Sequence, residues 1–115
     1  MDREDYLSEL ELNFPEAFEQ IEDSEKGLIH CEVAAFRRYL EGQMDEGKEW
    51  VCEKGFKFIA NCLNSPTPDL ENALEISFIE DLALGEQKSS YYDVIKSRAP
   101  VIIQEKLAIS HEFWK

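Results

Sequence analysis

Basic residues are scarce in this sequence, and their scarcity narrows what the protein can bind. Its 115 residues include 12 lysines and arginines against 25 aspartates and glutamates, which gives a formal net charge of −13. Such a charge repels phosphates and anionic lipids, so it argues against nucleic acid and membrane surfaces as partners. It attracts basic proteins and accelerates their encounter. The general alternative is that the acidity only keeps a small protein soluble.

Long apolar runs and paired cysteines are also lacking. No apolar stretch approaches the roughly 18 residues of a transmembrane helix, and the segment MDREDYLSEL does not have the pattern of a secretory signal. The cysteines, Cys31, Cys52 and Cys62, are odd in number and have no C-x-x-C spacing. We therefore expect reduced, mostly buried thiols in a cytoplasmic protein.

Recognisable catalytic and cofactor motifs are missing too. The two histidines are His30 and His111, and His30 follows a helical pattern next to Cys31, where neighbouring side chains point about 100° apart. The sequence contains no Glu-x-x-His motif, calcium loop or glycine-rich phosphate loop. It therefore predicts no enzymatic activity, metal or other cofactor. A cysteine–histidine pair made by the fold, such as Cys52 with His111, is the alternative.

Helical periodicity runs through the chain, and no segment alternates with the period of two that is typical of strands. Breaks in the pattern occur at Pro15, residues 22–27, Gly47 (with Gly42 as an earlier alternative), residues 64–69 and residues 85–90. We expect one all-α domain over residues 1–115, a compact orthogonal bundle of about six or seven helices. Two stacked helix pairs, as in helical repeat proteins, are the alternative arrangement.

The segment 69–84 has the clearest apolar pattern. A core face at spacings of three and four is formed by Leu70, Ala73, Leu74, Phe78 and Leu82. Ile76, Ile79 and Ala83 broaden this face, which predicts a central helix that is flanked on two sides.

The polar strip of the same helix is acidic and contains no basic residue. It consists of Glu71, Asn72, Glu75 and Asp81. Glu71 and Glu75 are four residues apart, and like charges at this spacing cost a few tenths of a kcal/mol. Tolerance of that repulsion makes the strip a candidate partner-binding site. The alternative is that the helix dipole favours Glu71 in the first turn.

Aromatic and basic side chains add further expectations. Tyr91 and Tyr92 cannot both point inward, and an exposed tyrosine is a good interface anchor. The alternative is that one is buried while the other lies along the surface. Trp50 and Trp114 are expected in the core or as terminal staples. Arg37 and Arg38 are expected to pair with N-terminal glutamates.

The N-terminal segment carries most of the excess charge. Residues 1–25 hold ten acids, and Arg3 is their single base. We expect Glu4, Asp5, Glu9 and Glu11 to steer a basic partner toward the binding site.

Several segments resemble those of a known family. FRRYLEG, KGFKFIANCLNS and NALEISFIEDL, together with the tyrosine-containing segment that follows, resemble small, acidic, all-helical bacterial proteins of largely unassigned function. Members are similar to proteins encoded beside polymorphic or secretion-system toxins, where they serve as immunity proteins. The resemblance is strongest in residues 33–84, and it implies neutralisation of a toxin without identifying that toxin.

The sequence therefore favours a cytoplasmic immunity protein that binds one cognate toxin or effector with a basic surface and occludes its active cleft. We expect the contacts to come from Glu71, Asn72, Glu75, Asp81, Tyr91 and Tyr92. The alternatives are an acidic nucleic-acid mimic or regulatory adaptor that binds a basic host protein, an enzyme with an unrecognised cysteine or carboxylate site, and a structural helical module.

Overall fold

The described part of the chain is built from helices alone. The computed structural model describes residues 1–84 and 99–113. Within these ranges it describes the side chains of all residues except 83, 84 and 110–113. Within these residues there are six helices, one of them continuous over residues 68–84, and no strand, so the predicted all-α bundle is confirmed. None of these helices has the length and apolar character needed to cross a membrane. The elements are α1 (Arg3–Asn13), α2 (Pro15–Glu19), α3 (Ile29–Asp45), α4 (Glu49–Cys62), α5 (Pro68–Ala73), η1 (Leu74–Glu80), α6 (Asp81–Leu84) and α8 (Val101–Phe113).

Local chemistry sets the helix ends. Asp2 and Asp5 form a reciprocal capping box at the start of α1. At the end of α3, the N–H of Gly47 donates to the carbonyl of Met44, and the N–H of Lys48 donates to that of Gln43, both at 3.0 Å. These two bonds form a Schellman motif, which needs the left-handed φ of +72° that Gly47 supplies. The predicted stop at Gly47 is therefore confirmed.

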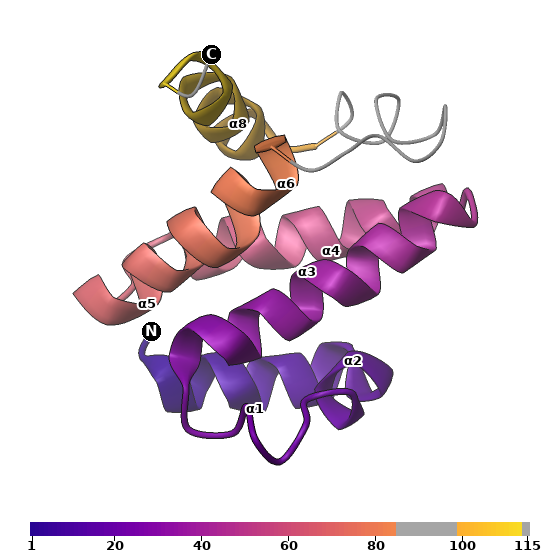
Figure 1. The fold of residues 1–115 in the computed structure, drawn as a ribbon, viewed down its shortest axis with the longest axis vertical. Helices are drawn as coiled ribbons and strands as arrows, with labels where there is room; N and C mark the ends of the chain where they lie inside the picture. The colour runs from indigo at the N-terminus through magenta and orange to yellow at the C-terminus, as the bar shows by residue number, and fades with distance from the viewer. Residues whose placement is uncertain (85–98, 114–115) are drawn as a thin grey trace.

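Elements α5, η1 and α6 form one continuous rod (Figure 1). Its middle segment, η1, is a π-helix, a form more often seen as a single-turn bulge. All five residues of the predicted core face are buried, and so are Ser77 and Ile79, whereas Ile76 is 43% exposed. The rod contacts α3 and α8, which confirms the prediction of a central helix flanked on two sides.

The helices are arranged around an aromatic core. In Figure 1, α1 and α2 lie on one side of α3 and α4, and α8 lies on the other side, against η1 and α6. Phe36 of α3 stands at the centre, with its ring centroid 5.0 Å from Phe14, 5.5 Å from Phe58 and 6.0 Å from Phe78. Its contacts with Phe14, Phe58 and Phe78 are tilted, edge-to-face and stacked, respectively, and they join the N-terminal helices, α4 and the rod through one residue.

The expectation for Trp50 was wrong. Trp50 lies in the first turn of α4, and its side chain is 72% exposed. The opposite face of α4 supplies the buried residues, among them Val51, Cys52 and Phe56. Trp114, the other tryptophan, lies outside the described residues.

Gly55 explains how closely α3 and α4 pack. A Cβ built on Gly55 would lie 2.6 Å from both terminal methyl carbons of Leu40 and 3.1 Å from its Cγ. Leu40 is completely buried, so its side chain has little room to move aside. A glycine that weakens the helix therefore permits a close contact between α3 and α4.

We predict that Gly55→Ala lowers the free energy of unfolding by about 1 kcal/mol. The overpacking penalty of about 1–3 kcal/mol exceeds the gain in helix propensity of about 1 kcal/mol. Gly42→Ala is the matched control, because Gly42 also lies within a helix and an added Cβ there meets nothing within 4 Å. The control should be more stable than the wild type in urea denaturation, by up to about 1 kcal/mol. Equal stabilisation by both substitutions would contradict the close contact.

Candidate partner-binding surface

The acidic strip predicted on the rod is divided by internal ion pairs. Glu75 accepts a hydrogen bond from Lys106 of α8. Asp81 accepts one from Arg37 of α3 at 2.6 Å, and Arg37 also pairs with Glu41 at 3.0 Å. These two carboxylates therefore join the rod to its neighbouring helices. Asp81 is nevertheless about half exposed, and Glu71 is exposed on the first turns of the rod.

Asn72 contributes to a polar contact between the rod and α3. Its amide nitrogen donates to Nε2 of His30 at 3.5 Å, and Nδ1 of His30 lies 2.8 Å from Oγ of Ser77. Arg37 completes this contact by donating to the carbonyl oxygen of Ser77 at 3.0 Å. Tyr91 and Tyr92, the remaining predicted contacts, lie outside the described residues.

Two of the cysteines are poor nucleophiles in this fold. Cys52 and Cys62 are fully buried. Burial raises the pKa of each thiol to about 12. Both therefore stay protonated at neutral pH, whereas a reactive cysteine needs a thiolate. Within the part of the chain that the structure describes, no three histidine, cysteine or carboxylate side chains come together in a way that could hold a metal ion.

The exposed carboxylates instead gather on the N-terminal helices. Nine of the ten acids in residues 1–25 are exposed on α1, α2 and the turns around them. We call this surface the acidic face, and it consists of Asp2, Glu4, Asp5, Glu9, Glu11, Glu16, Glu19, Glu22 and Asp23. Exposed Leu12 lies among them on the outer side of α1.

Arg3, the one base in this segment, points into the molecule. Its Nε and Nη2 donate to the two carboxylate oxygens of Glu32 at 2.7 and 2.8 Å. Glu32 is 2% exposed, and its carboxylate also accepts the N–H of Gly27 at 3.2 Å. The contact raises the pKa of Arg3, chiefly through the hydrogen bond to Glu32. Because Arg3 is bound to Glu32, the basic residue that remains next to the acidic face in the sequence is Lys26, which pairs with Asp23.

Sequence reasoning missed the burial of Glu32, although a signal was present. Glu32, Phe36 and Leu40 follow one another at spacings of four, so they share one face of α3. The pairing predicted for the arginines was half right. Arg38 pairs with Glu25 of the N-terminal segment at 2.9 Å, whereas Arg37 pairs with Glu41 and Asp81.

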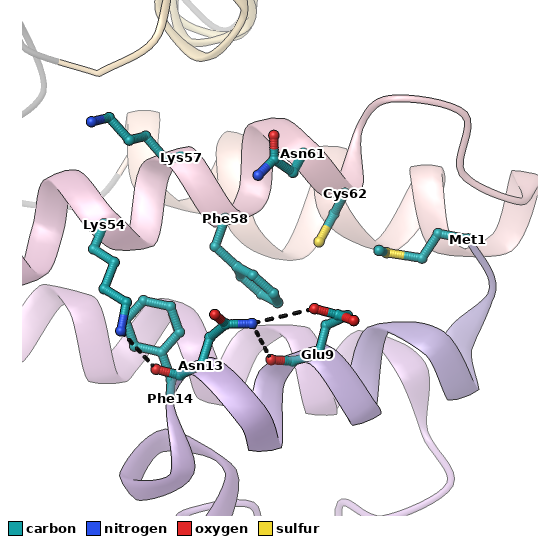
Figure 2. Close-up of a pocket in the computed structure, with 9 residues that line it drawn as sticks. All are labelled: Met1, Glu9, Asn13, Phe14, Lys54, Lys57, Phe58, Asn61 and Cys62. Atoms are coloured by element: carbon teal, nitrogen blue, oxygen red, sulfur yellow. Dashed lines mark hydrogen bonds between the residues drawn. The ribbon is translucent and has the colours of Figure 1, made fainter.

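A groove runs between α1 and α4 beside the acidic face. Figure 2 shows its larger part, a pocket of about 260 Å³ with Glu9 and Asn13 on α1 and with Lys57, Phe58 and Cys62 on α4. Lys54 crosses the groove, since its Nζ donates to the carbonyl of Asn13 at 3.1 Å and lies 4.8 Å from the ring centroid of Phe14.

Beyond Lys54 the groove continues into a pocket of about 200 Å³. Its lining includes Pro15, Glu16, Tyr39, Trp50 and Val51. Partial burial raises the pKa of the Tyr39 hydroxyl, and the nearby carboxylate of Glu16 adds to the effect. This end of the groove therefore combines aromatic rings with a carboxylate.

Comparison with known proteins identifies a family. A family model described as a domain of unknown function, DUF7674, matches residues 7–115. The chain belongs to the DUF7674 family. No curated protein and no solved structure matches the chain significantly. Because the DUF7674 description assigns no activity, the resemblance to immunity proteins stays a prediction.

We predict that Arg3→Ala destabilises this DUF7674 protein by about 2–3 kcal/mol, because it leaves a buried carboxylate without its charged partner. Arg3 itself is 34% exposed, which limits the loss. The control is Lys26→Ala, which removes an exposed ion pair to Asp23 and should change the stability by less than about 0.5 kcal/mol. Urea denaturation at neutral pH measures both. Equal, small effects would show that the buried pair does not anchor α1.

Proposed function

We propose that this protein is a cytoplasmic, immunity-type inhibitor that acts by binding and not by catalysis. Its acidic face docks on the basic surface of a cognate toxin or effector protein and covers the active cleft of that protein. The observation that carries this proposal is the concentration of nine exposed carboxylates on α1, α2 and the turns around them, with the one arginine of the segment bound to buried Glu32.

Charge of one sign on one face favours a fast encounter with a partner of the opposite sign. Electrostatic attraction raises association rates well above those of neutral surfaces, and it also disfavours acidic partners. A basic cleft is the expected feature of a protein that attacks nucleic acid, so occupation of such a cleft by the acidic face would block access of the substrate.

Charge alone gives limited affinity, and tight binding also needs apolar contact area. Two large apolar side chains are exposed beside the acidic face. Leu12 lies on α1 among the carboxylates, and Trp50 lies at the end of the groove next to Glu16. Exposed tryptophan is the residue type most enriched among interface hot spots, together with tyrosine and arginine.

The rod is a weaker candidate for the centre of the interface. Glu75 and Asp81 are already paired with Lys106 and Arg37, so a basic partner would have to break those contacts first. Glu71 and Asn72 remain as exposed residues that could contact the partner at the edge of the interface.

Several observations support binding over catalysis. The thiols of Cys52 and Cys62 are buried and protonated. Ser77, the hydroxyl next to His30, is also buried, and both ring nitrogens of His30 are engaged between α3 and the rod. These polar groups therefore have a structural explanation in helix packing.

The first test is affinity capture from the source cells with the wild-type protein as bait, followed by co-expression of each captured protein. We expect one basic partner bound in a fixed ratio, which arrests growth when expressed alone and is harmless together with the wild type. Capture of many unrelated basic proteins that dissociate in moderate salt would instead support the nucleic-acid mimic. Capture of no basic protein would contradict both.

A charge-reversal pair then locates the surface. The double variant Glu4→Lys/Glu11→Lys should weaken binding of the captured partner by about tenfold or more, since it reverses charge within the acidic face. Glu71→Lys/Glu105→Lys is the comparison for the rod and α8, because it changes the net charge equally at exposed sites there. Since Glu71 is at most an edge contact, this variant should lose less affinity than the first, and a stronger loss would place the partner on the rod instead.

A further inference from the structure

The pocket at the Trp50 end of the groove has a composition that the general acidity does not explain. It is lined by Phe14, Tyr39 and Trp50, together with the carboxylate of Glu16. Phe14 and Tyr39 are in edge contact, with ring centroids 6.3 Å apart, and Tyr39 stacks on Phe36 of the core. Two of the three aromatic walls are thereby held in place, while Trp50 is exposed.

Aromatic faces beside a carboxylate form a site for a cation. The negative face of each ring attracts a positive charge, and the carboxylate adds an ion pair and hydrogen bonds. The protein already uses this chemistry at the same place, because the ammonium of Lys54 lies 4.8 Å from the centroid of Phe14. That cation is held against the pocket wall by its hydrogen bond to the carbonyl of Asn13.

We propose that this pocket binds an arginine side chain of the basic partner, an inference that rests on the function proposed above. The planar guanidinium stacks on Trp50 and Tyr39, and its N–H groups donate to the carboxylate of Glu16. Arginine suits the pocket better than lysine, because a flat, weakly hydrated cation can stack on a ring and donate to a carboxylate at the same time.

The charges around the pocket partly oppose and partly favour this occupant. The ammonium of Lys54 keeps its positive charge, because its hydrogen bond is to the neutral carbonyl of Asn13, whereas Lys48 is paired with Glu46 at 2.9 Å. Glu16 belongs to the acidic face, so the attraction that brings a basic partner to α1 and α2 also brings it to the pocket. A second copy of this chain is a poorer occupant, because two acidic faces would repel each other.

The direct test uses a defined probe. The peptide acetyl-Gly-Arg-Arg-Gly-amide is titrated into the full chain, and the indole N–H resonance of Trp50 is followed by NMR. The same peptide with citrulline in place of both arginines is the control, since citrulline has nearly the same shape without the charge. We expect a saturable shift of the Trp50 resonance with the arginine peptide and at least about a threefold weaker response with the citrulline peptide.

Two variants separate the pocket from general charge attraction. Calorimetry should show that Glu16→Gln and Trp50→Ala each lower the affinity of the protein for the arginine peptide by about threefold or more. Glu19→Gln removes one exposed carboxylate from the same helix, at a residue that does not line the pocket, and should have a smaller effect. Circular dichroism checks that each variant is folded.

Equal losses of peptide affinity for Glu16→Gln and Glu19→Gln would contradict arginine binding in the pocket, and so would chemical-shift changes along α1 without a change at Trp50. Neither result would contradict the function proposed for the acidic face. Self-association of the wild type that Trp50→Ala abolishes in sedimentation would also contradict arginine binding in the pocket, because a second copy would then be the occupant. Failure to capture any basic partner would contradict the proposed function, and the peptide titration would still report on the pocket by itself.

Discussion

The ion pair between Arg3 and Glu32 is the contact on which the surface chemistry of this protein depends. It holds α1, a helix with an acidic outer side, against α3, and it pairs the only arginine of the N-terminal segment with a buried carboxylate. Glu32 would otherwise be a buried charge without a charged partner, which folded proteins rarely tolerate. The same contact therefore stabilises the attachment of α1 and gives the molecule one face of uniform charge. Everything proposed about its partner follows from that face and from the groove beside it.

The sequence was sufficient to predict features that local chemistry decides. Pro15 and Gly47 end helices for reasons contained in a few neighbouring residues, and the buried side of the rod follows from its apolar spacing. The close contact at Gly55 was not predictable in the same way. It depends on Leu40, fifteen positions earlier, and only the packing of α3 on α4 brings the two together.

The candidate site was less predictable, because ion pairs between distant residues decide which acids stay available. Arg37 and Asp81 are 44 positions apart, and Lys106 and Glu75 are 31 apart. A sequence pattern shows these carboxylates as one acidic strip, whereas the fold gives two of them a cation. Trp50 was misjudged for a related reason. Its size suggested burial, but the first turn of α4 turns the residue toward solvent beside Glu16 and Tyr39.

The most direct test of the central claim is the association rate constant of the captured partner, measured by stopped flow over a series of salt concentrations. If the acidic face guides the encounter, the rate constant should fall steeply as salt rises, because ions screen exposed charges within about 10 Å at 0.1 M salt. A variant with Glu4, Glu11 and Glu19 changed to glutamine should associate more slowly and depend less on salt. Identical rates and salt dependence for this variant and the wild type would contradict the account.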